Sequence, residues 1–183
     1  MRRFVLIHGM SCHLDKCFGE KIKARLKARG YEIVEPFFPL GKDISLNGWN
    51  EVMDKVVQNV DEDTCFLCHS LGCLYVIKYL FRKHANCNAV IVVAGGILNR
   101  PIKEFAFLSD FMPTEEELEH FKTHTQKVYD ITSNNDHIFT QEELDLYVTK
   151  TNAQKIFIPN CGHFGRSSGV KDIPQIETIL DKI

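Results

Sequence analysis

The sequence has no excess of charge of either sign and no long apolar run. Its 183 residues include 22 Lys+Arg and 24 Asp+Glu, a formal net charge of −2. Binding to nucleic acid or to an anionic membrane requires clustered positive charge, so neither partner is expected. The longest nearly apolar run, Ala89 to Leu98, contains two glycines and is about half the length of a membrane-spanning helix. These absences and the length of the chain favour a compact soluble domain, too small to include a second catalytic domain.

The N-terminus lacks a secretory signal, and the cysteine count does not fit a set of disulfides. Only Phe4 to Ile7 are apolar before His8 and Gly9 interrupt the run, which is shorter than the core of a signal peptide. The chain has 7 cysteines, an odd number that cannot all pair within it. Unpaired cysteines behave as small buried hydrophobic residues in a reducing compartment. A cytoplasmic location is therefore expected.

Short apolar runs alternate with helical patterns along the whole chain, without a repeat, a low-complexity tract or a linker. Strands are expected at residues 4–7, 31–35, 64–68, 89–93, 127–131 and 155–158, and helices at 18–29, 48–60, 71–84, 114–123, 141–150 and 172–183. This alternation is typical of βαβ units. The runs are too uniformly apolar for a sheet with one wet face. The predicted fold class is α/β: a single three-layer domain over residues 1–183, with a mainly parallel sheet of about six strands and helices on both faces.

Three residues with complementary chemistry follow three of the expected strands. Ser70 follows the third strand at a strand-to-helix turn, Asp136 follows the fifth strand, and His163 follows the sixth. Because ligands bind at the carboxyl ends of strands in open parallel sheets, these side chains are expected to meet there. Ser-Asp-His is also the chain order of the α/β-hydrolase triad. The sequence therefore predicts Ser70 as nucleophile, His163 as general base and Asp136 as the carboxylate that orients the base.

The turn at the predicted nucleophile also supplies hydrogen-bond donors for an oxyanion. The peptide N–H of Leu71 lies at a helix N-terminus, and Gly72 leaves room for a close approach of that helix. The second oxyanion donor is expected to be the N–H of Met10, in the loop after the first strand. Cys68 stands where the G-x-S-x-G pattern has its first glycine, so the motif alone is weak, and this cysteine could crowd the turn.

Several polar residues near the predicted triad have simpler structural interpretations. His69 is expected to point away from the nucleophile as a structural histidine, and His8 is expected to shape the oxyanion loop. Asp130 lies within its strand and is less favourably placed than the acid that follows the strand. Asn135 is interpreted as a surface polar residue, with a role in shaping the loop of the acid as the alternative. None of these four residues is assigned to catalysis.

No metal site is expected from the cysteines and histidines. Cys65 and Cys68 form a C-x-x-C pair, but side chains three apart in a strand face opposite sides, so both are interpreted as core residues. His120 and His124 share a helix face without the H-E-x-x-H pattern, so a solvated polar face is the preferred interpretation.

At these motifs the chain resembles the small serine hydrolases related to retinoblastoma-binding protein nine, within the α/β-hydrolase superfamily. The resemblance rests on Trp49 one helix before the turn, H-S-x-G at His69 to Gly72, S-x-x-D at Ser133 to Asp136, and Asn-Cys-Gly-His-Phe at Asn160 to Phe164. It implies an α/β-hydrolase domain that hydrolyses small esters or amides through the same triad, without a metal or other cofactor. Asn135 replaces an acidic residue often seen in the family. The L-x-C-x-E motif that binds pocket proteins is not matched by Leu71–Tyr75, so no such partner is expected.

The irregular segment after the fourth strand carries three phenylalanines that could contact a substrate. Phe105, Phe107 and Phe111, together with Trp49, are expected to line an acyl pocket, although each residue fits an ordinary core equally well. Only about residues 95–123 are left for a cap, which predicts a shallow pocket and a small acyl substrate. The favoured function is a serine hydrolase that cleaves small carboxylic esters or amides through an acyl-enzyme. The alternatives are a thioesterase or peptidase with the same triad, and a non-catalytic binding protein of this fold.

Overall fold

The six expected strands form one parallel sheet. The structure is a computed structural model and describes residues 2–11, 13–100 and 106–183. The strands are β1 (Arg3–Ile7), β2 (Glu32–Val34), β3 (Thr64–His69), β4 (Cys87–Val93), β5 (Thr125–Thr132) and β6 (Gln154–Phe157). They pair in the order β2-β1-β3-β4-β5-β6, and every pairing is parallel. The strand order runs outward from β1 in both directions, so the carboxyl ends of β1 and β3 are neighbours in the sheet.

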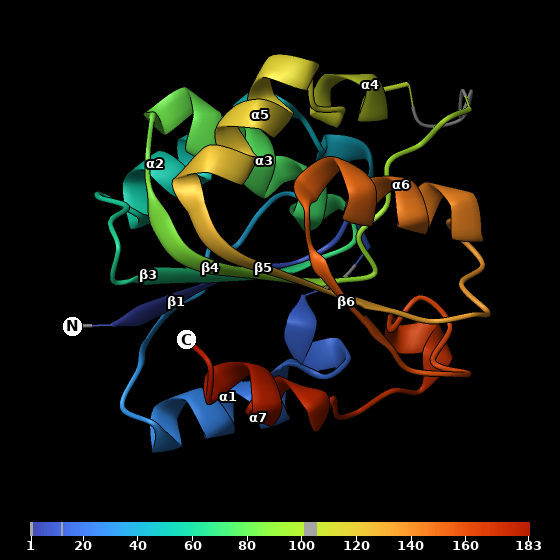
Figure 1. The fold of residues 1–183 in the computed structure, drawn as a ribbon. Helices are drawn as coiled ribbons and strands as arrows, with labels where there is room; N and C mark the ends of the chain where they lie inside the picture. The colour runs from blue at the N-terminus through green and yellow to red at the C-terminus, as the bar shows by residue number, and fades with distance from the viewer. Residues whose placement is uncertain (1, 12, 101–105) are drawn as a thin grey trace.

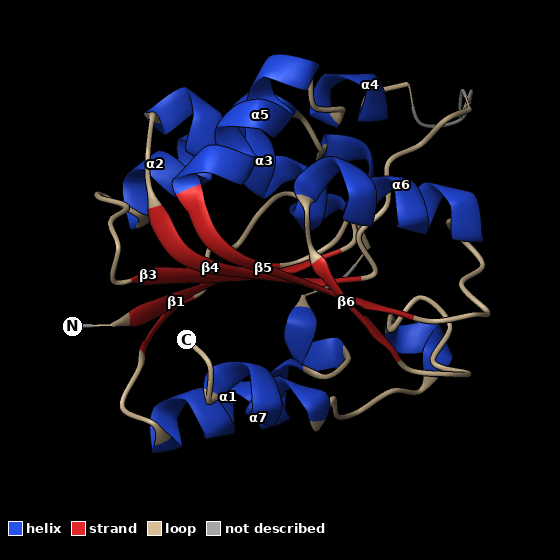
Figure 2. Ribbon diagram, in the orientation of Figure 1, coloured by secondary structure: helices blue, strands red, loops and turns tan. Residues whose placement is uncertain are grey.

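Helices cover both faces of this sheet and complete three layers (Figure 1). One face carries α1 (Gly19–Ala28) and α7 (Gln175–Leu180). The other face carries α2 (Leu46–Val56), α3 (Leu71–Lys83), α4 (Leu108–Phe111), α5 (Glu115–His124) and α6 (Gln141–Thr151). Figure 2 shows the strands as a continuous layer between the two groups of helices. The predicted α/β class with helices on both faces is confirmed.

The apolar residues of the strands divide between two cores, one on each side of the sheet. Cys65 belongs to the core under α1 and α7, with Phe4 and Ile176. Cys68 belongs to the core under α2, α3 and α6, with Trp49. The C-x-x-C pair therefore points to opposite faces, as the strand period requires. Burial raises the pKa of the Cys65 thiol to about 11 and that of Cys68 well above its ordinary value, so both remain thiols in the core.

Much of the segment predicted as a cap forms a regular crossover helix. Thr114 caps the N-terminus of α5: its side chain accepts the N–H of Glu117 while the Glu117 carboxylate accepts the N–H of Thr114. This is the capping box that the sequence pattern indicates. Helix α5 then packs on α3 and α6 and leads into β5. Only α4 and its flanking residues lie outside this regular pattern among the described residues, and Phe105 lies outside the described ranges.

Asp130 is a fully buried carboxyl in the middle of β5. Burial raises the pKa of this carboxyl well above its ordinary value. The N–H of Gly95 donates to Oδ1 at 3.4 Å, and among the described residues Oδ2 has no hydrogen-bond partner. The folded protein therefore holds a proton that the unfolded chain releases above the ordinary carboxyl pKa. By linkage, the stability of the fold falls as the pH rises from that value toward the raised pKa of Asp130.

We expect Asp130→Asn to stabilise the protein at alkaline pH. The amide has the shape of the protonated carboxyl but does not have to take up a proton when the protein folds at alkaline pH. The free energy of unfolding should therefore rise by about 1–3 kcal/mol near pH 8 and by much less near pH 4. Urea unfolding at the two pH values measures the difference. Asp110→Asn, at an exposed position of α4, is the control and should change neither value by more than about 0.5 kcal/mol. An equal gain at both pH values would contradict a protonated Asp130.

Candidate active site

Ser70 lies at a sharp turn where β3 ends and α3 begins. Its backbone has φ 54° and ψ −120°, a conformation that costs a non-glycine residue about 1–3 kcal/mol. The turn also requires a close approach of α3 to the end of β1. A Cβ atom on Gly72 would lie 2.7 Å from Ile7 Cγ2 and 2.8 Å from the His8 carbonyl oxygen, so no other residue fits at this position. The strained turn places the Ser70 hydroxyl in a cavity at the carboxyl end of the sheet.

Cys68 does not disturb this turn, although it replaces the first glycine of the usual motif. Its side chain is fully buried in the core beneath α3, where it lies near the thiols of Cys73 and Cys87. The turn itself is formed two residues later, by the positive φ of Ser70. The departure at Cys68 therefore leaves the nucleophile turn intact.

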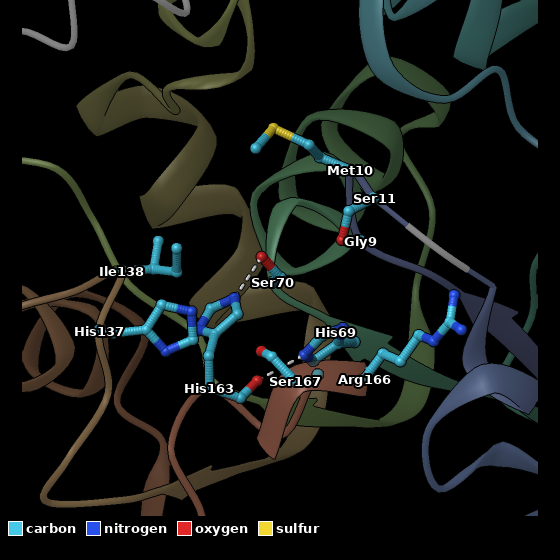
Figure 3. A pocket seen from close by; sticks show the side chains of 11 residues that line it. Gly9, Met10, Ser11, His69, Ser70, His137, Ile138, His163, Arg166 and Ser167 are labelled. Carbon is cyan, nitrogen blue, oxygen red and sulfur yellow. Dashed lines mark hydrogen bonds between the residues drawn. The ribbon is translucent and has the colours of Figure 1, made fainter. Parts of the chain in front are cut away.

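The three predicted triad residues lie within hydrogen-bond distance of one another. His163 Nε2 is 2.7 Å from Ser70 Oγ, and His163 Nδ1 is 2.7 Å from Asp136 Oδ2. The side chains of His163 and Asp136 are only 10% and 1% exposed. Figure 3 shows the imidazole directed at the Ser70 hydroxyl inside the cavity. With Nδ1–H donating to the carboxylate, Nε2 is free to accept the proton of the hydroxyl, which is the arrangement of a nucleophile with its base.

The Asp136 carboxylate is held in its ionised form. Burial alone would raise its pKa, but the hydrogen bond from His163 and the interaction with the imidazole outweigh burial and hold the pKa below its ordinary value. The N–H groups of Ile138 and Phe139 contribute in the same direction by donating to Oδ1 at 2.7 and 3.1 Å. The two carboxylate oxygens thus have different partners: Oδ1 accepts from the backbone and Oδ2 accepts from the imidazole. An acid with this division of contacts fixes the orientation and tautomer of its histidine.

The loop that carries His163 is held by side chains of the loop that carries Asp136. Three hydrogen bonds form this clamp: Asn160 N–H to Asn134 Oδ1 at 2.8 Å, Cys161 N–H to Ser133 Oγ at 2.9 Å, and Gly162 N–H to Asn135 Oδ1 at 2.7 Å. The Ser133 hydroxyl in turn donates to Asn135 Oδ1 at 3.0 Å. Asn135 is exposed, as its interpretation as a surface residue predicts, and its oxygen also joins the loops of Asp136 and His163, which favours the alternative role in shaping the loop of the acid.

Replacing Asn135 tests whether this clamp positions the imidazole. We expect Asn135→Ala to lower kcat about tenfold with KM nearly unchanged, because the alanine leaves the Gly162 N–H without an acceptor and loosens the loop before His163. Asn135→Asp keeps an acceptor oxygen and should recover most of kcat. Steady-state ester hydrolysis by the two variants measures the effect. Equal losses in both variants, or a loss in KM alone, would contradict a positioning role.

The predicted oxyanion donors border the triad. Leu71 is the first residue of α3, so its N–H lies at a helix N-terminus directly behind the nucleophile. Met10 lines the cavity beside Ser70, and its carbonyl accepts the N–H of Gly41 at 3.3 Å, which ties the oxyanion loop to the segment after β2. Leu71 and Met10 thus flank the hydroxyl, and their role as oxyanion donors remains a prediction.

Two buried histidines support the site without titrating near neutral pH. His8 Nδ1–H donates to the Gly9 carbonyl at 2.7 Å, and His8 Nε2 accepts the N–H of Phe38 at 3.2 Å. Burial lowers the pKa of His8 to about 4. His69 Nε2–H donates to the carbonyl of His163 at 2.8 Å, and burial lowers the pKa of His69 to about 3. His8 therefore braces the loop after β1 and His69 braces the loop of His163, in agreement with their structural interpretations.

Two cavities meet at Ser70. The larger cavity has a volume of about 560 Å³ and is lined in part by His163, Ser11, Arg166 and Ser167. The smaller is an apolar slot of about 40 Å³, with Leu71 and Leu74 of α3, Leu108 and Met112 around α4, and Ile138 and Phe139 beyond the acid. These slot residues, apart from Leu71, are the ones that the sequence analysis missed. Leu74 fits a helical core pattern equally well, so only the fold shows that it borders the nucleophile.

Three of the four aromatic residues predicted to line the acyl pocket, Trp49, Phe107 and Phe111, do not border the two cavities at Ser70. Trp49 and Phe111 are both fully buried, with ring centroids 5.3 Å apart, in the core between α2 and α3. Phe107 packs against the same core, and none of the three is among the described residues that line the two cavities. Phe105 lies outside the described residues. The core interpretation therefore replaces the substrate assignment for Trp49, Phe107 and Phe111.

Neither a metal cluster nor a membrane span is found in the part of the chain that the structure describes. No group of three or more His, Cys, Asp and Glu side chains is arranged there to hold a metal ion. The rings of His120 and His124 stack with centroids 3.9 Å apart on α5, and His124 Nδ1–H donates to the His120 carbonyl at 2.9 Å. No described helix is both long enough and apolar enough to cross a bilayer.

The sheet order, the three layers and the turn at the nucleophile define an α/β-hydrolase fold. The family model described as serine hydrolase matches residues 4–182, so the chain belongs to the serine hydrolase family, as the resemblance implies. No curated protein sequence gives a significant match.

Solved structures share this fold over the whole chain. The ydeN gene product of B. subtilis is 20% identical, with a TM-score of 0.88 over 100% of this chain and 98% of that one. A ydeN-like hydrolase from Pectobacterium atrosepticum is 12% identical, with a TM-score of 0.72 over 100% of this chain and 90% of that one. Est1E from Butyrivibrio proteoclasticus, solved with ferulic acid, is 14% identical, with a TM-score of 0.67 over 100% of this chain and 86% of that one. At these identities the likeness shows the fold alone.

Proposed function

We propose that this protein hydrolyses small carboxylic esters through an acyl-enzyme formed on Ser70. The observation that carries the proposal is the continuous chain of hydrogen bonds from Ser70 Oγ through the His163 imidazole to the Asp136 carboxylate. A serine hydroxyl becomes a nucleophile when a base accepts its proton, and the base is effective when a buried carboxylate fixes its tautomer. All three requirements are met at the mouth of a cavity.

Each step of the reaction has a residue in this site. Ser70 Oγ attacks the ester carbonyl while His163 Nε2 takes its proton, and the N–H groups of Leu71 and Met10 stabilise the oxyanion. The tetrahedral intermediate then collapses, and His163 returns the proton to the departing alkoxide. Water attacks the acyl-enzyme with the same imidazole as base, which releases the acid and restores the hydroxyl. Asp136 remains ionised and stabilises the imidazolium in both halves of the reaction.

The two cavities separate the acyl group from the alcohol. The departing oxygen must lie within reach of the His163 imidazole, which borders the larger cavity and not the apolar slot. The acyl group therefore enters the slot beside Leu71 and Leu74. A volume of about 40 Å³ accommodates about three water-sized groups, given that one requires roughly 10–15 Å³. Acyl groups of about two to four carbons fit this space. This size agrees with the small substrate expected from the few residues of the protein that are left for a cap.

Turnover of p-nitrophenyl esters by the wild-type protein tests this function. We expect acetate and butyrate esters to be hydrolysed with an initial burst of one p-nitrophenol per protein, and the octanoate ester to have a kcat/KM at least tenfold lower. Matched thioesters and aminoacyl amides in the same assay decide between an esterase, a thioesterase and a peptidase. No turnover of any acyl compound above the buffer rate would overturn the proposal in favour of a non-catalytic binding protein.

A further inference from the structure

The wall of the larger cavity carries a positive charge that the catalytic steps do not use. Arg166 lies in the short 3-10 helix Arg166–Ser168, just after the loop of the catalytic base, and borders the cavity together with Ser11 and Ser167. Arg166 borders this cavity and not the apolar slot, and Figure 3 shows its side chain along the wall beside Ser167. The guanidinium is therefore placed on the alcohol side of the reacting carbonyl.

This arginine differs from others in the protein because its charge is not neutralised. Arg3, Arg25, Arg29, Arg82 and Arg100 each form a salt bridge with a carboxylate. Among the residues that the structure describes, Arg166 has no such partner, and no carboxylate borders the larger cavity. The Asp136 carboxylate accepts a hydrogen bond from the His163 imidazole and does not pair with Arg166. A cavity with an unpaired guanidinium and no carboxylate favours a ligand that brings its own negative charge.

We propose that Arg166 binds an anionic group, a carboxylate or a phosphate, on the alcohol part of the substrate. The inference rests on the proposed esterase function and makes its substrate class more specific: a short-chain acyl ester of a negatively charged alcohol. Guanidinium is suited to this role because its planar N–H donors match a carboxylate or phosphate in two parallel hydrogen bonds. The hydroxyls of Ser11 and Ser167 are further donors at the same wall. The anion is fixed at a distance from the scissile bond, so its binding energy serves to orient the ester.

A matched pair of substrates isolates this charge. Meta-acetoxybenzoate carries a carboxylate on its alcohol part, and meta-acetoxybenzamide is its neutral counterpart with the same acetyl group. In the wild-type protein we expect kcat/KM for the anionic ester to exceed that for the neutral ester roughly tenfold or more, mainly through a lower KM. Arg166→Gln should reduce this ratio to near one, and Arg166→Lys should keep part of it, because lysine retains the charge but not the paired donors. Added salt should reduce the wild-type ratio and leave the ratio of Arg166→Gln unchanged.

The controls separate this inference from the proposed function. Lys27→Gln removes the same charge from an exposed position of α1 and should leave the ratio at its wild-type value, because Lys27 does not border the cavity. Equal ratios in the wild type and Arg166→Gln, with the neutral ester still hydrolysed, would overturn the role of Arg166 and leave the esterase intact. An equal fall in the ratio of kcat/KM values in Lys27→Gln would also overturn the role of Arg166. The preference for the anionic ester would then depend on the net charge of the protein and not on this arginine. No hydrolysis of either ester would overturn the proposed function and this inference with it.

Discussion

Ser70→Ala is expected to lower kcat for p-nitrophenyl acetate by about 10⁴- to 10⁶-fold. The methyl group of alanine cannot attack the ester carbonyl, so no acyl-enzyme can form at position 70. What remains is the weak acceleration provided by the oxyanion donors and by substrate binding. The initial burst should disappear completely, because no acyl-enzyme accumulates. The dissociation constant of the substrate should change little, since the hydroxyl contributes to bond formation more than to binding.

The fold should tolerate this substitution, which makes the kinetic result interpretable. Alanine at position 70 must still adopt φ near 54°, and Ala94 already does so at 55° in the same molecule. Thermal unfolding of the wild type and the variant measures whether the fold is retained. Ser109→Ala, at an exposed position of α4, is a matched control that should retain full activity. Residual turnover within tenfold of the wild type would contradict the assignment of Ser70 as nucleophile.

Asp136→Asn is expected to lower kcat by about 10⁴-fold without unfolding the site. The reason lies in the division of contacts between the two carboxylate oxygens. Oδ1 accepts the N–H groups of Ile138 and Phe139, so the asparagine must keep its carbonyl oxygen there. Its NH₂ group then faces His163 Nδ1, which must become an acceptor. The imidazole proton moves to Nε2, and that nitrogen can no longer take the proton of Ser70.

Steady-state kinetics of Asp136→Asn and a matched variant test this explanation. Asp145→Asn alters an exposed carboxylate of α6 and should leave kcat within about twofold of the wild type. Asp136→Asn should retain KM and the unfolding transition, because the cavity and the backbone contacts remain. A fall in kcat of less than tenfold would mean that another group orients His163.

The juxtaposition of the three proposed catalytic residues is predictable from the sequence because it follows from the order of secondary structure. Ser70, Asp136 and His163 each follow a strand, and a parallel sheet brings the ends of its strands to one edge. Each residue type also has a chemistry that the other two complete. The positions along the chain and the chemistry of the side chains are together sufficient to select these three residues. The distances of 2.7 Å from His163 to Ser70 and from His163 to Asp136 agree with that selection.

The substrate-binding residues are much less predictable, because an apolar residue has the same pattern in a core and in a pocket. Trp49 and Phe111 lie deep in the core, whereas Leu74 and Met112 border the nucleophile, and nothing in their spacing separates the two pairs. The contact of Asn135 with the loop of His163 is hard to predict for a different reason. Its partner, the N–H of Gly162, is 27 residues away along the chain, and only the arrangement of two loops brings them together. Local pattern therefore predicts elements and catalytic positions, and long-range contacts decide the pocket and the supports of the site.

The most direct test of the proposed mechanism is to identify the residue that a fluorophosphonate labels, by peptide mass spectrometry after the wild-type protein has reacted with the probe. A fluorophosphonate phosphonylates a serine that is activated by a base, and activity is lost as the adduct forms. The mechanism predicts one adduct, on Ser70, that is absent from Ser70→Ala and forms far more slowly in Asp136→Asn. Absence of an adduct on Ser70, or an adduct on another serine together with an active Ser70→Ala variant, would contradict it.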